Sequence, residues 1–201
     1  MEKSAEIKLI NNCLAKTFIN IESTARLHMG FFDLHGGLGR KFGSIGLSID
    51  APAIELSAKH SKSVLVDGLS TVPVAVLERA TVLAKKFMQK VNIKSGIELH
   101  IKQHIPEHAG LGSGTQTAIA IGTAISQLYG LGLSTKEISV LTGRGGRSGI
   151  GIAAFDMGGV IIDGGRIINA AQSNIPPLIA RYDFPADWRV LLIFDNSCKG
   201  V

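Results

Sequence analysis

Residues 106–115 read PEHAGLGSGT, and this stretch decides how the chain folds around it. Before it, apolar and polar residues alternate, which predicts a half-buried strand over 97–105. After it, residues 115–129 carry no charged side chain, which predicts a helix buried on nearly every side. Alternate glycines let backbone N–H groups turn toward a ligand, and the helix start adds a positive dipole. The stretch therefore predicts a phosphate- or pyrophosphate-binding loop, with a tight ligand-free turn as the alternative. Its proposed ligand-binding residues are Gly110, Leu111, Gly112, Ser113, Gly114 and Thr115.

The segments outside this loop alternate between strand-like and helix-like patterns. Strands are predicted at 18–21, 25–32, 45–49, 54–58, 64–66, 160–163, 167–170 and 189–194. Further helices are predicted from Pro73 to Val91, from the capping box that begins at Ser134 to Gly143, and from near Ser148. Gly164-Gly165 indicates a hairpin between two of the strands. Interleaved helices and strands with hairpin-like pairs favour a two-layer α+β fold over a doubly wound sheet.

Composition excludes several classes of protein. The chain has 201 residues, of which 45% are hydrophobic and 18% charged, so it is not a disordered tail. It has no apolar run long enough to cross a membrane, and two cysteines cannot form a disulfide framework, so we expect a cytoplasmic protein. The net charge is +5, but only 5% of the residues are aromatic, and we expect no nucleic-acid partner. The basic excess lies in residues 59–104 and is typical of a solvated surface.

A second glycine-rich stretch carries arginines. Residues 143–151 read GRGGRSGIG, and the planar guanidinium groups of Arg144 and Arg147 match a carboxylate or phosphate in two-point contact. With Ser148, these residues are the predicted binding site for substrate anions. Asp156 and Asp163 follow within the next fifteen residues, and each could either bind a metal ion or cap a turn.

Three segments resemble a known family. The glycine loop resembles the phosphate-binding motif of the GHMP superfamily of small-molecule kinases. Residues 24–34, TARLHMGFFDL, and residues 143–165, GRGGRSGIGIAAFDMGGVIIDGG, resemble the β-ribofuranosylaminobenzene 5′-phosphate synthases within that superfamily. The resemblance runs from about residue 22 to residue 195.

The resemblance implies a pentosyltransferase of methanopterin biosynthesis. Such an enzyme joins phosphoribosyl pyrophosphate to 4-hydroxybenzoate or 4-aminobenzoate and releases CO2 and pyrophosphate. Arg26, His28 and Asp33 are then candidate catalytic residues, and Mg2+ bridging the phosphates is expected, held by Asp156 or Asp163.

The resemblance also implies a domain division. Residues 1–180 would form a GHMP-type N-terminal domain similar to ribosomal-protein-like α+β folds, and residues 181–201 would begin a truncated second domain. Exposed apolar surface at such a place favours a homodimer. An ATP-dependent kinase stays open as an alternative, although Ile150 occupies roughly the position of a kinase catalytic aspartate. A non-catalytic fragment and an RNA-binding module also stay open.

Overall fold

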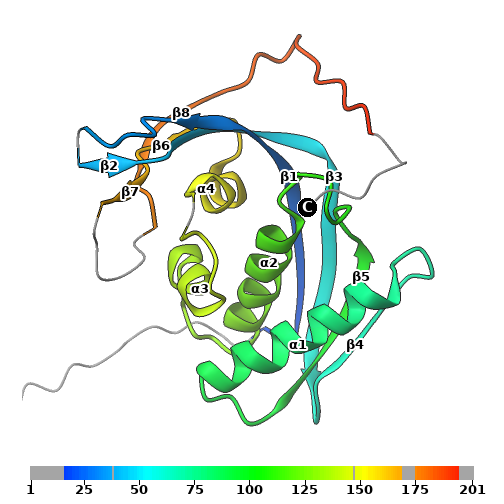
Figure 1. The fold of residues 1–201 in the computed structure, drawn as a ribbon. Coiled ribbons are helices and arrows are strands. Elements are labelled where there is room, and N and C mark those ends of the chain that lie inside the picture. The colour runs from blue at the N-terminus through cyan, green and yellow to red at the C-terminus, as the bar shows by residue number, and fades with distance from the viewer. Residues whose placement is uncertain (1–15, 38, 147, 169–174, 195–201) are drawn as a thin grey trace, which may run out of the picture.

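The structure, a computed structural model, describes residues 16–37, 39–146, 148–168 and 175–194. It has a six-stranded main sheet with the path β4-β5-β3-β6-β8, in which β1 also pairs with β3. A separate two-stranded ribbon joins β2 to β7. Four helices pack on one face of the curved main sheet (Figure 1). This arrangement confirms the predicted α+β class.

The elements follow one another in an order close to the predicted one. Strands β1 (Phe18–Phe32), β2 (Arg40–Lys41), β3 (Gly43–Ser61) and β4 (Leu65–Gly68) precede helix α1 (Val74–Lys90). Strand β5 (Gly96–Gln103) then leads into α2 (Ser113–Leu128), α3 (Thr135–Leu141) and α4 (Ile150–Met157). Strands β6 (Val160–Asp163), β7 (Arg166–Ile167) and β8 (Leu178–Tyr182) follow.

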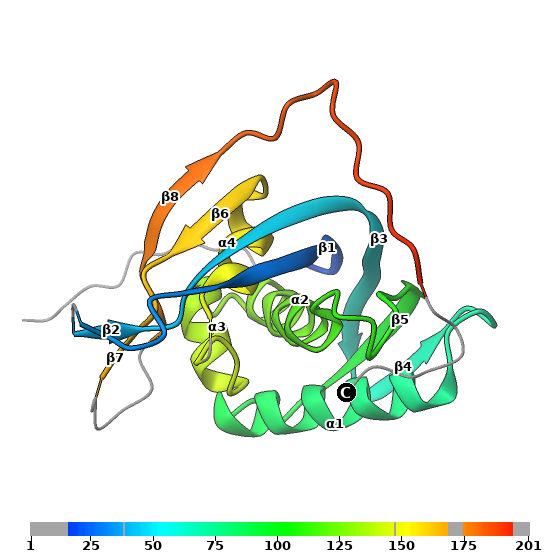
Figure 2. The same cartoon turned by 45° about the horizontal axis from the view of Figure 1, so that its top comes forward.

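Strand β3 organises the main sheet because it is long enough to serve three neighbours. It runs antiparallel to β1 over almost its whole length. On its other edge, residues 55–61 pair with β5 and residues 44–47 pair with β6. Figure 2 shows this strand arching over α2. The arch brings the end of β6 and the start of α2 into the same region of the fold.

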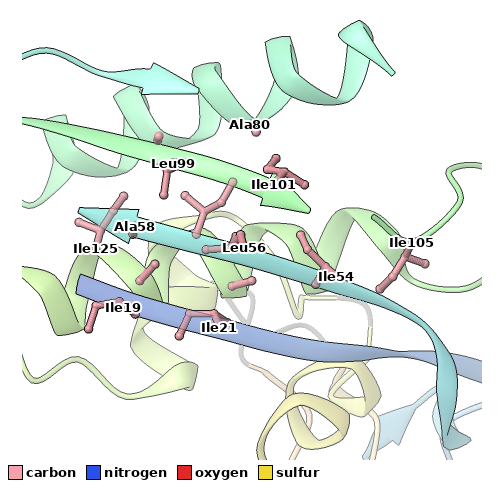
Figure 3. Close-up of a cluster of buried hydrophobic side chains, with 14 of the residues drawn as sticks. Ile19, Ile21, Ile54, Leu56, Ala58, Ala80, Leu99, Ile101, Ile105 and Ile125 are labelled. Carbon is pink, nitrogen blue, oxygen red and sulfur yellow. The ribbon is translucent and has the colours of Figure 1, made fainter. Parts of the chain in front are cut away.

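The core lies between the sheet and the helices. The buried residues in this space include Ile125 of α2 and, from the neighbouring strands β1, β3 and β5, Ile19, Ile21, Ile54, Leu56, Leu99 and Ile101 (Figure 3). Buried and exposed residues alternate along the first half of β1, as expected for a strand with one face in a core. Helix α2 buries ten of its residues, which confirms the buried helix that its uncharged sequence predicts. The exposed side of α1 carries Lys85, Lys86 and Lys90.

The strands predicted at 18–21 and 25–32 are continuous in β1, and those predicted at 45–49 and 54–58 are continuous in β3. β1 continues through 22–24, where the buried hydroxyl of Ser23 donates to Oε1 of Gln116 at 2.7 Å. β3 continues through Pro52, which lies between the paired residues Ser48 and Ala53, where the register with β1 shifts. A proline is tolerated there because no regular ladder bond needs its missing N–H.

Two strand predictions are wrong. Residues 160–163 and the strand after Gly164-Gly165 do not form a hairpin, because β6 already has β3 on one edge and β8 on the other. Strand β7 pairs with β2 instead, and residues 169–170 of the predicted strand lie outside the described residues. The strand predicted at 189–194 is irregular chain, and Leu191 and Ile193 are exposed.

Strand β8 itself spans the domain boundary expected after residue 180. No helix in the described part of the chain is long and apolar enough to cross a membrane.

Gly122 provides a test of the helix packing. A Cβ at this position of α2 would lie 2.4 Å from Cγ2 of Ile138 and 3.1 Å from Cε2 of Phe87. Alanine favours a helix over glycine by about 1 kcal/mol, but overpacking a core costs about 1–3 kcal/mol. We therefore expect Gly122→Ala to lower the free energy of unfolding in urea titrations. The additional substitution Ile138→Ala should recover part of that loss, and purely additive effects would contradict this account.

Candidate functional site

The glycine loop joins β5 to the start of α2. Gly110 and Gly112 have φ values of 73° and 77°, which favour glycine over any residue with a side chain. Gly112 is the N-cap of α2, and no side chain caps this end of the helix. The first N–H groups of a 16-residue helix and its positive dipole are therefore available to an anion. The loop has the geometry that the sequence predicts, while its binding of phosphate stays a prediction.

Arg26 connects β1 to this loop. Its backbone N–H donates to the carbonyl oxygen of Leu111 at 3.1 Å, and its Nη1 donates to the carbonyl oxygen of Gly110 at 2.9 Å. Its Nε is buried without a hydrogen-bond partner in the described part of the chain. Burial lowers the pKa of the guanidinium, but an arginine keeps its charge at neutral pH. A positive charge is thus fixed against the loop.

A pocket of about 620 Å³ opens beside the loop, and we call it the arginine pocket. Its walls come from β1, α2, α4, β7 and the connection between α3 and α4. The lining residues are Arg26, Thr115, Gly143, Arg144, Gly145, Gly146, Ser148, Gly151 and Arg166. These described lining residues include three arginines and two residues with hydroxyl groups, and none of them is an aspartate or glutamate. This charge balance favours an anionic ligand.

The pocket brings together residues that lie far apart in the sequence. Arg26, Thr115, Arg144 and Ser148 were each predicted as site residues, and all four line it. A Cβ at Gly114 would lie 3.5 Å from both terminal nitrogens of Arg144, so this guanidinium lies against the glycine loop. The side chain of Leu111 is in the core, and its part in the site is its backbone carbonyl. Ser113 is not among the lining residues of the described pocket. Arg147 falls outside the described residues.

Sequence reasoning missed Arg166. It follows Gly164-Gly165 directly, at the end of the long glycine-rich motif, and belongs to the ribbon rather than to the main sheet. An arginine next to a double glycine is the same signal that identified Arg144. The prediction of a β6–β7 hairpin concealed it, because that hairpin would have placed the residue in the main sheet.

The carboxylate of Asp163 holds one side of the pocket in place. It is 1% exposed, and its Oδ2 accepts hydrogen bonds from the hydroxyls of Ser44 and Ser148 at 2.6 and 2.8 Å. The N–H of Gly149 donates to the same oxygen at 2.8 Å, and the N–H groups of Ser44 and Gly165 donate to Oδ1 at 3.2 and 3.0 Å. Asp163 therefore positions Ser148 and the start of α4.

Gln116 performs a similar task on the other side. It is fully buried, and its Oε1 accepts the hydroxyl proton of Ser23 on β1 at 2.7 Å. Its Nε2 donates to the carbonyl oxygen of Gly151 on α4 at 2.8 Å. One side chain on α2 thus fixes β1 and α4 relative to the helix that follows the glycine loop.

The two carboxylates predicted to hold Mg2+ do not fit that role. Asp163 is enclosed and already accepts five hydrogen bonds, whereas the exposed Asp156 accepts a hydrogen bond from Thr135 Oγ1 at 2.5 Å. Asp163 therefore supports the turn after β6 and the start of α4, which is the alternative that the sequence leaves open, whereas Asp156 links α4 to the start of α3. Within the described ranges, no three His, Cys, Asp or Glu side chains gather as a metal-binding group.

His28 and Asp33 lie near the pocket but are not among its described lining residues. Nε2 of His28 is buried and has no hydrogen-bond partner among the described residues. Burial lowers the pKa of His28, nearby Arg26 lowers it further, and Asp163 acts in the opposite direction. The imidazole is therefore mainly neutral at pH 7. Asp33 instead stabilises a turn, because its Oδ1 accepts the N–H of Gly36 at 3.1 Å and lies 3.3 Å from Nδ1 of His35.

Known proteins share this sequence pattern. Residues 76–159 match the family described as GHMP kinases N terminal domain. The beta-ribofuranosylphenol 5′-phosphate synthase of Archaeoglobus fulgidus is 39% identical over 183 residues, which are 87% of this chain and 56% of that protein. The protein of the same name from Methanocaldococcus jannaschii is 36% identical over 199 residues, which are 88% of this chain and 60% of that protein. The chain thus spans between half and two thirds of the length of these relatives.

Solved structures show the same fold. The mevalonate kinase of Methanococcus jannaschii superposes with a TM-score of 0.54 at 18% identity, covering 72% of this chain and 52% of that protein. The mevalonate kinase of L. major, in complex with R-mevalonate, gives a TM-score of 0.57 at 16% identity. The match covers 81% of this chain and 52% of that protein. At such identities the likeness concerns the fold alone. Residues 76–159, which contain the glycine loop and most of the residues around it, are thus similar in sequence to the family described as GHMP kinases N terminal domain.

Proposed function

We propose that the chain belongs to an enzyme that makes β-ribofuranosylphenol 5′-phosphate from phosphoribosyl pyrophosphate and 4-hydroxybenzoate. The observation that carries this proposal is the arginine pocket at the glycine loop, in a chain similar to three archaeal proteins named beta-ribofuranosylphenol 5′-phosphate synthase. The sequence leaves 4-aminobenzoate open as the second substrate. A phenol in the names of the relatives favours the hydroxy acid, because its hydroxyl group is retained in the product.

The proposed reaction explains why the pocket is positive. The bond between the anomeric carbon and the diphosphate oxygen breaks, and both electrons leave with the diphosphate. The ring carbon that carries the carboxylate bonds to the anomeric carbon, and the carboxylate then departs as CO2 while its bonding electrons return to the ring. The diphosphate gains one negative charge in this exchange. Groups that stabilise that charge are therefore the main catalytic requirement.

The chain supplies these groups from three directions. Arg26 and Arg144 lie against the glycine loop, and the start of α2 adds N–H donors and the helix dipole. Thr115 adds a hydroxyl group at the pocket wall, whereas the hydroxyl proton of Ser148 is donated to Asp163. Arginine is suited to this task because its planar group makes two-point contacts with phosphate oxygens. In this proposal, His28 is a neutral neighbour of Arg26 and takes no part in the bond changes described above.

Mg2+, a homodimer and a cytoplasmic location stay predictions. The described lining of the pocket offers no carboxylate for a metal ion, and Asp156 and Asp163 do not fit one. We therefore derive no step through Mg2+.

A kinase is the weaker alternative. Transfer of phosphate to an alcohol needs a base for the substrate hydroxyl. Ile150, at the position where the sequence comparison with kinases suggests such a base, is fully buried and apolar. ADP formation that depends on a small alcohol would restore the kinase alternative.

The function can be tested with carboxyl-labelled 4-hydroxybenzoate and phosphoribosyl pyrophosphate. Because the chain spans 56% of the A. fulgidus relative, the assay uses a chimera in which this chain replaces the matching part of that protein. We expect CO2 and pyrophosphate in equal amounts, and an Arg144→Gln chimera should be slower by roughly 10²–10³-fold. A folded chimera that binds both substrates but releases no CO2 would refute the proposal. The 201-residue chain alone should bind phosphoribosyl pyrophosphate but release little CO2, because catalysis also requires water to be excluded.

Gly112 provides a test of the loop. A Cβ there would lie 2.9 Å from Cζ of Arg26, so Gly112→Ala should displace this guanidinium and weaken binding of phosphoribosyl pyrophosphate about tenfold or more in calorimetry. Gly132→Ala is the matched control, because Gly132 also has a positive φ, of 64°, but no atom lies within 4 Å of its Cβ position. Equal affinities for the two variants would show that the loop does not bind the diphosphate.

His28 provides a test of the electrostatics. Its pKa in the folded chain should lie below the ordinary 6.5, as measured by NMR titration of its ring protons. Arg26→Gln should raise this pKa by removing a positive neighbour, whereas Asp163→Asn should lower it by removing a negative one. Since the folded state binds the proton less tightly than the unfolded state, stability should be lost as the pH falls below about 6.5. That loss should be smaller in His28→Gln, and an equal loss in that variant would contradict the assignment.

A further inference from the structure

Arg166 differs from the other two arginines of the pocket in what it touches. Arg26 and Arg144 lie against the glycine loop, but Arg166 lies on β7 with its Cζ 4.9 Å from the centre of the Phe42 ring. A guanidinium over an aromatic face is held by the charge of the ring, and its edge stays free for other partners. The pocket therefore has one cation that is paired with an aromatic surface.

Phe42 belongs to a cluster of rings. The ring of Phe31 meets Phe42 edge-on at 5.9 Å, and His28 lies against Phe31 at 4.4 Å between ring centres. Phe31 is 50% exposed, so part of this cluster is open to a ligand. We call His28, Phe31 and Phe42 the aromatic wall.

The backbone holds Phe42 in an unusual conformation. Its φ is 61°, which a bulky residue seldom adopts. Its N–H donates to the carbonyl oxygen of Asp33 at 3.3 Å, which ties the residue between β2 and β3 to the end of β1. Residues held in strained conformations concentrate at ligand sites.

The ribbon also fixes Arg166. Nη1 of Arg40 on β2 donates to the carbonyl oxygen of Gly165 at 2.9 Å. Gly165 has a φ of 67°, and a Cβ there would lie 2.3 Å from the carbonyl oxygen of Lys41. Only glycine allows this approach, and the approach sets where the next residue, Arg166, leaves the backbone.

We propose that Arg166 and the aromatic wall form a subsite for a planar aromatic carboxylate, separate from the diphosphate subsite at the glycine loop. Any cation attracts both anions, but a cation beside open aromatic rings also gains contact with a ligand ring. The inference rests on the proposed function, in which the aromatic acid and the diphosphate must meet in one pocket. It assigns the acid to the β7 side and the leaving group to the α2 side.

Calorimetry on the 201-residue chain tests the subsite directly. Three ligands separate its parts: 4-hydroxybenzoate has ring and carboxylate, phenol lacks the carboxylate, and cyclohexanecarboxylate lacks the aromatic ring. We expect the wild-type chain to bind 4-hydroxybenzoate most tightly. Arg166→Gln should weaken its binding about tenfold while changing affinity for phosphoribosyl pyrophosphate less than about twofold. Arg144→Gln should show the opposite pattern.

Further variants identify the ring contact. Phe42→Leu should weaken the binding of 4-hydroxybenzoate about threefold or more and leave the affinity for cyclohexanecarboxylate almost unchanged. Arg166→Lys retains the charge without the two-point contact. Its affinity for 4-hydroxybenzoate should therefore lie between those of the wild type and Arg166→Gln. Lys86→Gln and Phe18→Leu are matched controls on exposed residues elsewhere, and neither should alter the affinities.

The outcomes distinguish the subsite from the proposed function. The subsite would be overturned if Arg166→Gln lost affinity for both substrates equally, or if it lost no affinity for 4-hydroxybenzoate. It would also be overturned if the wild-type chain bound phenol and 4-hydroxybenzoate equally well. If Arg166→Gln selectively loses affinity for 4-hydroxybenzoate but the chimera releases no CO2, the subsite is supported and the proposed function is refuted. If the chimera releases CO2 while Arg166→Gln binds 4-hydroxybenzoate normally, the function stands and the subsite is wrong.

Discussion

The buried carboxylate of Asp163 is the constraint on which the site depends. Five donors from three parts of the chain converge on its two oxygens, at the end of β6, the start of β3 and the start of α4. A buried carboxylate is tolerated only when it is fully hydrogen-bonded, so these segments cannot separate without exposing an unsatisfied charge. The glycines around it allow the backbone to come close enough for such bonds. The same aspartate therefore explains why the pocket wall is both glycine-rich and well defined.

The arginine pocket is the electrostatic counterpart of this arrangement. Its described walls collect three positive charges and the positive end of a helix, with the nearest structural carboxylate enclosed behind Ser148. Like charges in one pocket repel one another, and Nε of Arg26 is buried without a partner among the described residues. An anion in the pocket would reduce the repulsion between the three guanidinium groups. Binding of an anion should thus stabilise the fold, since a ligand that binds only the folded state shifts the unfolding equilibrium toward that state.

The sequence predicts the elements of the fold well and their pairing less well. The uncharged helix, the capping box at Ser134 and the glycine loop depend on local patterns, and each lies where its pattern predicts. The partner of β7 and the irregular course of 189–194 depend on which sheet edges are already occupied, and no local pattern records that. The same holds for the site. Arg144 and Ser148 could be recognised from their glycine-rich surroundings, whereas the roles of Asp163, Gln116 and Arg166 follow from contacts between distant segments.

The bond between Ser44 and Asp163 also constrains the order in which the molecule can assemble. These residues are 119 positions apart, and β3 receives its last neighbour on that edge only when β6 is present. During synthesis, the antiparallel pair β1–β3 and the unit β4-α1-β5 can form first, because their contacts lie nearer in sequence. The first half of β3 then waits with an open edge until more than a hundred further residues have left the ribosome. An open edge of this kind can pair wrongly with other strands.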